Sequence, residues 1–218
     1  MAIEDRTRSD VAVSSGDPCP FLRALVSDGY LVDHTVPIPH LHRVVVEAAG
    51  TPIAGLGLTM IALTGNGLQP GLLVRNARHG VELDELRGVP ADKRGSGSRI
   101  LDQRGQVDWA ELDRLSEFAS PKTAADGSTE LGLSMSELNK MMSANFERAR
   151  GRRRPIDRLM MMGEWPILLL AMGKRTSSAK RYLAVDEVRT LFAQRRLPAR
   201  VLDRLRSVSR TGSSTGSS

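Results

Sequence analysis

The sequence predicts an all-α fold with a single domain, and three observations lead to this prediction. Residues that cap helix N-termini, and prolines suited to the first helical position, recur along the chain. Glycines repeatedly follow apolar runs with helical spacing, as they do where helices end. No segment convincingly alternates apolar and polar residues over the length of a β-strand.

Four helices are expected in the N-terminal half. The first begins after Pro20, because proline fixes φ and lacks an N–H that would be unpaired at the first helical position. Thr51 and Pro52 supply an N-cap and a first helical residue for an apolar helix. The expected helices cover residues 21–27, 40–49, 52–63 and 70–79, and glycines or a Gly-Asn-Gly turn follow them.

Capping boxes and prolines mark the helices of the C-terminal half. Asp108 with Glu111, and Ser134 with Glu137, have the spacing of a capping box. Helices are therefore expected after Asp108 and after Ser134, followed by helices over residues 155–172, 185–194 and 198–208. Pro166 lies inside the longest of these, where its missing N–H predicts a kink.

Composition indicates a globular chain. Its 218 residues are 40% hydrophobic and 26% charged, which suits one helical domain over residues 16–208 with disordered tails at 1–15 and 209–218. A single cysteine excludes an internal disulfide. The polar N-terminus shows no secretory signal, and the apolar stretch 53–63 is too short to span a bilayer. We therefore expect a cytoplasmic protein.

Positive charge is concentrated at the C-terminal end. Residues 150–218 carry 16 Lys and Arg against 5 Asp and Glu, whereas the whole chain has a net charge of +6. A basic third favours nucleic acid or anionic lipid as a partner. However, aromatic residues make up only 4% of the chain, and prolines divide the basic segment into short helices. The pattern therefore disfavours nucleic-acid binding.

Cys19 is the first candidate for chemistry. It lies between Pro18 and Pro20, at or beside the N-cap of the first helix. Backbone N–H groups and the positive end of the helix dipole favour the thiolate form of such a cysteine. A thiolate is a ligand for a soft metal or a haem iron. Alternatively, Cys19 is a small buried hydrophobe.

Glu164 is the second candidate, because it interrupts the apolar run from Leu159 to Met172. It is either solvated on the outer face of the helix or held in a cavity for acid–base work. Leu56, Met60, Leu159, Met160 and Met162 would suit an apolar pocket, and core packing explains them equally well.

These residues resemble motifs of the haem-thiolate peroxidases, namely chloroperoxidases and unspecific peroxygenases. Pro18-Cys19-Pro20, followed by a helix and Gly29-Tyr30, is similar to the opening of that family, although Arg23 departs from its pattern. The resemblance implies haem b with Cys19 as the axial iron ligand. It also implies Glu164 as the distal acid that moves a proton between peroxide oxygens. Arg158, six residues earlier, would steady the acid, although it lies about 240° around the helix.

The acidic motif that binds a divalent cation in that family has no equivalent here. The nearest segment, residues 93–99, has glycine, serine and arginine but no carboxylate, so we do not expect the cation site. Lys93, Arg94 or Arg99 could pair with haem propionates instead. A flexible glycine-serine loop explains this segment as well.

Residues 52–197 also resemble caleosins, which are calcium- and haem-binding peroxygenases with histidine-ligated haem. Arg94 stands where their motif has histidine, which again favours Cys19 as the ligand. Asp126 and Glu137 have the spacing of the first and last residues of a calcium hand, but Leu131 occupies the place of the turn glycine. A capping box explains Glu137 equally well. The four histidines, at positions 34, 40, 42 and 79, show no zinc-binding spacing and are expected at the surface.

The sequence therefore predicts a helical, haem-peroxygenase-like enzyme that uses peroxide to oxidise or oxygenate a small organic substrate. The alternative is a non-enzymatic helical module that binds nucleic acid or anionic lipid through its basic C-terminal third. The identity of the substrate and the oligomeric state do not follow from the sequence.

Overall fold

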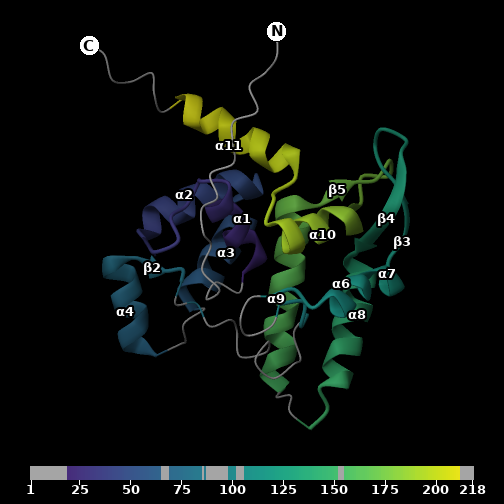
Figure 1. The fold of residues 1–218 in the computed structure, drawn as a ribbon, viewed down its shortest axis with the longest axis horizontal. Helices are drawn as coiled ribbons and strands as arrows, with labels where there is room; N and C mark the ends of the chain where they lie inside the picture. The colour runs from purple at the N-terminus through teal and green to yellow at the C-terminus, as the bar shows by residue number, and fades with distance from the viewer. Residues whose placement is uncertain are drawn as a thin grey trace.

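The computed structural model describes residues 19–64, 69–84, 86, 98–101, 106–151 and 155–211, except the side chains of 155–163 and 207–211. Within these residues the prediction of an all-α fold is wrong. Helices are combined with two antiparallel sheets, one of two strands and one of four strands in the order β3-β4-β6-β5 (Figure 1). The predicted tail at 1–15 lies outside the described residues, and so does 212–218.

The N-terminal half contains the four predicted helices and a short strand pair. Gly50 ends α2 in the left-handed conformation, with φ 64°, as the glycine pattern predicts. A Cβ built on Gly55 would lie 2.4 Å from Val46, so a glycine lets α3 approach α2 closely. The elements are α1 (Pro20–Ser27), β1 (Thr35–Val36), α2 (Ile38–Ala49), α3 (Pro52–Thr64), α4 (Pro70–His79) and β2 (Val81–Glu82).

The C-terminal half alternates helices with β-hairpins. The capping box expected at Ser134 and Glu137 is present, and Asp108 accepts a hydrogen bond from the N–H of Glu111. The elements are α6 (Trp109–Asp113), α7 (Leu115–Phe118), β3 (Ser120–Thr123), β4 (Thr129–Ser134), α8 (Met135–Arg148), α9 (Pro155–Met172), β5 (Lys174–Arg175), β6 (Arg181–Ala184), α10 (Val185–Gln194) and α11 (Ala199–Thr211).

Two hairpin units of similar build form the four-stranded sheet. The first hairpin unit consists of β3, β4 and α8, and the second consists of β5, β6 and α10. The inner strands β4 and β6 pair antiparallel, with Leu133 opposite Leu183. In each unit the inner strand leads directly into its helix, so this pairing also sets where α8 and α10 begin.

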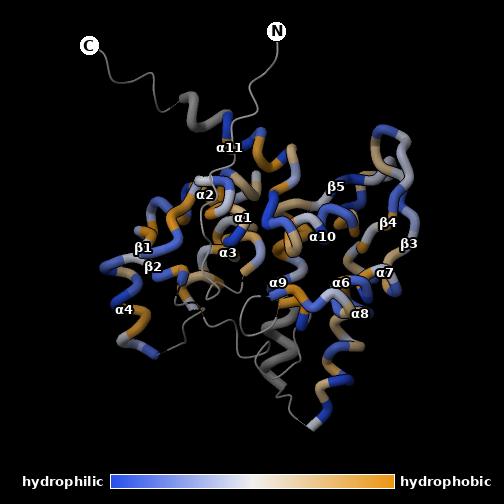
Figure 2. Tube along the Cα trace, in the orientation of Figure 1, coloured by the Kyte–Doolittle hydropathy of each residue, from blue (hydrophilic) through white to orange (hydrophobic). Residues whose placement is uncertain are grey.

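One main hydrophobic core extends through both halves. It includes almost all of α1 and the inner faces of α2, α3, α8, α9 and α10. In Figure 2 the hydrophobic parts of these helices face the interior, whereas the hairpin tips at the upper right are hydrophilic. The core places α1, which follows Cys19, and α9, which carries Glu164, in the same packed body.

Candidate functional site

Cys19 is the N-cap residue of α1, as the sequence predicts. Its backbone is extended, with φ −84° and ψ 110°, and Pro20 occupies the first helical position. The thiol makes no capping bond to the helix, and Cys19 is partly buried against the main core. The first N–H groups of α1 have no partners within the helix and point toward this end. They provide a positive environment that favours a thiolate.

Arg23, one helical turn after Cys19, is a buried basic residue of α1. Only 3% of Arg23 is exposed, although arginine is rarely buried. It lies one helical turn after Cys19, and its N–H donates to the Cys19 carbonyl at 3.0 Å. Residues four apart lie on the same face of a helix. In the sequence, Arg23 stands out only as a departure from a family pattern, and nothing there signals its burial.

Glu164 lies in the middle of α9 and is half-buried. The next residue, Trp165, is buried and stacks on Phe192 of α10, with ring centroids 6.3 Å apart. Ile167 meets Gly57 of α3, where an added Cβ would lie 2.7 Å from its side chain. α9 continues as one helix through Pro166. Glu164 therefore directly precedes the buried part of α9 that begins at Trp165, and its side chain is partly enclosed.

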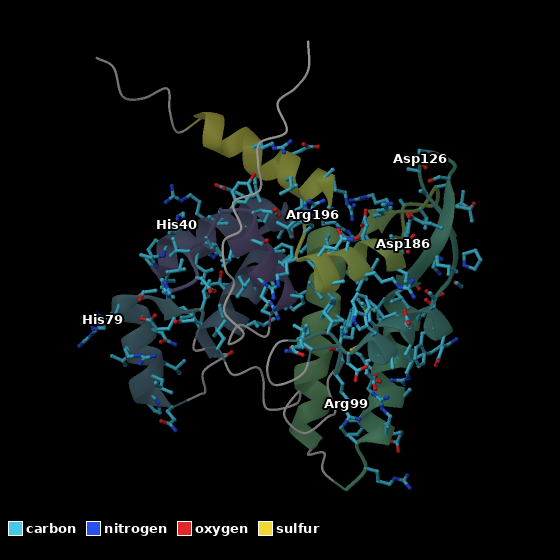
Figure 3. All side chains as sticks on the ribbon, viewed as in Figure 1. His40, His79, Arg99, Asp126, Asp186 and Arg196 are labelled. Atoms are coloured by element: carbon cyan, nitrogen blue, oxygen red, sulfur yellow. The ribbon has the colours of Figure 1, made fainter. Side chains whose placement is uncertain are left out.

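The other predicted site residues are less clearly placed. The backbone of Arg158 belongs to α9, but its side chain lies outside the described residues. Arg99 is exposed and has a left-handed backbone, with φ 59° (labelled in Figure 3). Lys93 and Arg94 also lie outside the described residues. The grouping of Arg158 and Arg99 with Glu164 or Cys19 stays a prediction.

Cys19 and Glu164 lie on two helices that meet through a third. α1 packs on α10, whereas α9 packs on α2, α3, α8 and β6 and stacks Trp165 on α10. The end of α1 is also tied to the chain after α10, because the N–H of Leu197 donates to Asp28 at 3.5 Å. The two candidate residues therefore lie on helices that are linked through α10.

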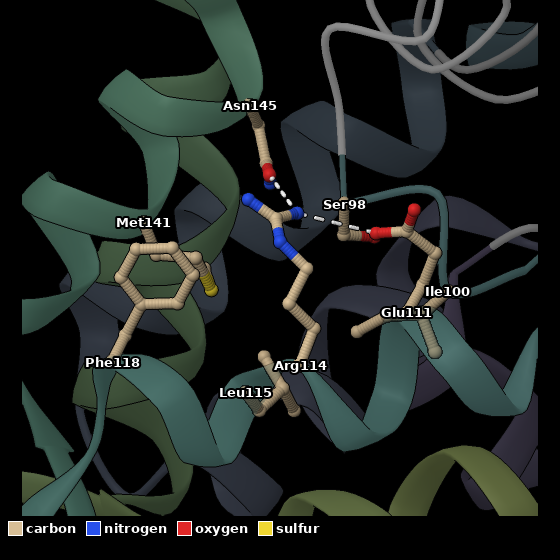
Figure 4. Close-up of a pocket in the computed structure, with 8 residues that line it drawn as sticks. All are labelled: Ser98, Ile100, Glu111, Arg114, Leu115, Phe118, Met141 and Asn145. Carbon is tan, nitrogen blue, oxygen red and sulfur yellow. Dashed lines mark hydrogen bonds and ion pairs between the residues drawn. The ribbon is translucent and has the colours of Figure 1, made fainter. Parts of the chain in front are cut away.

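A small pocket lies between α6, α7 and α8 (Figure 4). Arg114 crosses it and donates to Asn145 at 2.7 Å and to Glu111 at 3.3 Å. Burial would raise the pKa of Glu111, but Arg148 and Arg114 outweigh this effect and lower it. The empty space is about 190 Å³ and partly open to solvent. Sites for organic ligands usually enclose about 300–1,000 Å³, so this pocket is too small for haem.

The calcium-hand spacing does not form a cation site in the described residues. Asp126 lies at the tip of the first hairpin, where it accepts from Ser128 at 2.9 Å and 2.6 Å (Figure 3). Glu137 lies at the base, where it receives Lys122 at 2.7 Å and the N–H of Ser134 at 2.7 Å. The capping box therefore accounts for Glu137. In the described part of the chain, no three His, Cys, Asp or Glu side chains are grouped to hold a metal.

The histidines are exposed, as predicted, and Figure 3 shows His40 and His79 on the outer side of α2 and α4. His34 lies 3.5 Å from the Asp84 carboxylate. Nδ1 of His42 is 3.1 Å from the Thr59 hydroxyl. These single polar contacts account for surface histidines.

Many arginines of the basic C-terminal third are engaged within the fold. Arg189 binds Asp113 at 2.8 Å, and Arg148, just before this third, binds Glu111 at 2.6 Å and 2.8 Å. Arg200 binds Glu187 through both of its terminal nitrogens. These three arginines, all in the described part of the chain, lie on different helices and do not form one continuous stripe.

No family model, curated protein or solved structure matches this chain. Across the described ranges of residues, no helix has both the length and the apolar character needed to cross a bilayer.

Proposed function

We propose that the chain is a haem-thiolate peroxidase or peroxygenase that holds haem b between the start of α1 and α9. One observation carries the proposal: the single cysteine is the N-cap residue of a buried helix, with a buried arginine one turn later. A solvent-exposed or helix-internal Cys19 would have removed the basis for this proposal.

The chemistry of the described residues fits the proposed group. A thiolate is a soft donor that suits iron, and at the N-terminus of α1 the helix dipole would offset its negative charge. Glu164, on another helix, supplies a half-buried carboxylate that would act as the acid–base group. When bound, haem would supply the redox chemistry that activates peroxide, and a thiolate ligand would promote cleavage of the O–O bond.

Within this proposal each residue has one task. Cys19 Sγ would hold the iron, and Arg99 would pair with a propionate. The Glu164 carboxylate accepts a proton from one peroxide oxygen and returns it to the other as the bond breaks. Arg158 would orient that carboxylate. The substrate would be a small organic molecule.

The alternative is a non-enzymatic module that binds nucleic acid or anionic lipid. The engagement of Arg189 and Arg200 with carboxylates disfavours this alternative, because such arginines are less available to phosphates. Under the proposal, duplex DNA binding is weak and is lost at physiological salt. Submicromolar binding at that salt, together with no haem after haem-supplemented expression, would favour the module instead.

The Cys19→Ala variant tests the iron ligand. Thiolate ligation gives the ferrous–CO complex a red-shifted main absorption band, so we expect this band in the wild type and its loss in the variant. Since Cys19 is the only cysteine, no other thiol can substitute for it. A wild-type CO spectrum typical of histidine ligation would contradict the assignment.

The Glu164→Gln variant tests the acid–base group. Glutamine keeps the shape of the side chain but cannot carry the proton, so peroxide turnover should fall roughly 10²–10⁴-fold while haem is retained. Glu117→Gln is the matched control, because the Glu117 side chain is 69% exposed on α7. Equal turnover in the wild type and Glu164→Gln would contradict the acid–base role and indicate that Glu164 is a solvated surface residue.

A further inference from the structure

The C-terminal turn of α9 is held by arginine side chains. The last four carbonyls of an α-helix have no partners within the helix. Here the Leu169 carbonyl accepts from the N–H of Gly173 at 3.0 Å. The next three carbonyls each accept from an arginine: Leu170 from Arg181 at 2.7 Å, Ala171 from Arg204 at 2.8 Å, and Met172 from Arg200. Three guanidinium groups thus lie at the negative end of this helix dipole.

Arg204 also binds a second helix end. Its Nη1 donates to the carbonyl of Ala49, the last residue of α2, at 3.3 Å. A Cβ built on Gly50 would lie 2.6 Å from the same Nη1, so the glycine that ends α2 also leaves room for the arginine. One side chain from α11 therefore joins the C-termini of α2 and α9, and Figure 1 shows α11 lying over this end of the fold.

This arrangement brings like charges together. Burial lowers the pKa of Arg204, and the positive charges of Arg200 and Arg181 lower it further. Arg200 is balanced by Glu187, which it binds through both terminal nitrogens. The planar guanidinium of Arg204, with its forked donors, reaches two carbonyls at once. These two hydrogen bonds offset the repulsion between Arg204 and the positive charges of Arg200 and Arg181.

We propose that Arg204 is a positioning residue for Glu164 and that α11 is a strap that fixes the C-terminal half of α9. From Ala171 back to Trp165 the helix is largely buried, and Glu164 is the next residue. Pro166 removes one hydrogen bond from this part of α9, so contacts from outside the helix contribute more to its placement. The inference rests on the proposed function only in naming Glu164 as the group that is positioned.

Hydrogen exchange on the full-length, haem-free protein tests the strap. In Arg204→Met we expect several-fold faster exchange at the amides of Gly50, Trp165 and Gly173, with the amides of α8 unchanged. Arg206→Met is the charge-matched control, because Arg206 is 68% exposed and pairs only locally with Asp203. Leu202→Ala loosens α11 without removing a carbonyl contact. The proposal would be overturned if the amides of Arg204→Met exchanged at the same rates as those of either control variant.

The haem-loaded protein separates positioning from stability. Arg204→Met should lower kcat for peroxide without changing KM or the CO spectrum, and Arg204→Lys, which keeps one contact, should recover part of kcat. Faster exchange at Trp165 with an unchanged kcat would overturn the positioning role. If no haem binds, the proposed function fails, and exchange at the Trp165 amide alone then decides whether Arg204 controls this part of α9.

Discussion

The two hairpin units share one architecture but are specified in different ways. In both, a fully buried leucine of the inner strand pairs with its counterpart, Leu133 with Leu183. A glutamate follows four residues later in the first turn of the next helix. In both units that glutamate lies near a lysine from the outer strand: Glu137 near Lys122 at 2.7 Å, and Glu187 near Lys174 at 3.5 Å.

The first hairpin unit is stabilised by its own residues. An Asp126-Gly127 turn, with Gly127 at φ 87°, closes the hairpin, and the capping box of Glu137 starts α8. The second unit has Ala179 in the left-handed region at φ 62°, and Ala184 caps α10 without a side-chain bond. Its Glu187 instead binds Arg200 of α11. The same architecture therefore forms either from local sequence signals or from contacts with distant elements.

Substitution of either of the two paired leucines should have the largest effect on stability. Leu133→Ala and Leu183→Ala should each destabilise the protein by about 3–4 kcal/mol, because both side chains are fully buried. Chemical denaturation measures both values. The double variant should lose less than the sum, since the two residues lie opposite one another. A loss below about 1 kcal/mol at one position would show that the units are not equivalent.

Substitution of Glu137 should have the next largest effect on stability. Burial would raise its pKa, but hydrogen bonds from Lys122, Ser120 and Ser134 lower it from 4.5 to about 2. Because the folded-state pKa is depressed, the stabilisation is fully present above pH 4.5 and is lost as the pH falls toward 2. Glu137→Gln should therefore cost about 3 kcal/mol at pH 7 and progressively less below pH 4.5, measured by denaturation at several pH values.

Comparison with the second unit sharpens this prediction. Glu187→Gln removes the carboxylate that pairs with Arg200, so the loss of stability should shrink when Arg200→Met is added. Combining Glu137→Gln with Arg200→Met should instead give additive losses. If the stability losses of Glu137→Gln and Arg200→Met do not add, the idea that the first hairpin unit is stabilised locally is wrong.

The turn residues should give the smallest effects, of opposite sign. Gly127→Ala should destabilise the protein by about 1 kcal/mol through its positive φ alone, because an added Cβ would meet nothing within 4 Å. Ala179→Gly should stabilise it by about 0.5–1 kcal/mol, because glycine adopts φ 62° without strain. Thermal unfolding measures both. A loss of stability in Ala179→Gly would show that the second turn is not strained.

The helices were predictable because their signals are local. Pro20, Pro52 and Pro70 each lie at the start of a helix, and Gly50 ends one, as their backbone preferences dictate. The position of Cys19 as an N-cap follows from the same signals. Of the predicted site, this backbone placement of Cys19 is the part that the sequence defined best.

The strands and the arginine contacts were not predictable in this way. β5 and β6 contain two and four residues, too few for an alternating pattern. β5 pairs with β6, its neighbour in the chain, and β6 also pairs with the remote strand β4. Pro121 and Gly132, which are unusual within strands, further weaken the signal of the first hairpin. The burial of Arg23 likewise has no local signal.

The sequence by itself determined the helices, their caps and the location of the lone cysteine at a helix start, because each depends on backbone preferences within about one helical turn. The tertiary structure decided the register of β4 with β6, the convergence of three arginines on α9 and the link between α2 and α9 through Arg204. These features join residues as far apart as Ala49 and Arg204. Their partners are chosen by which apolar faces pack together and which carbonyls are left at the helix ends.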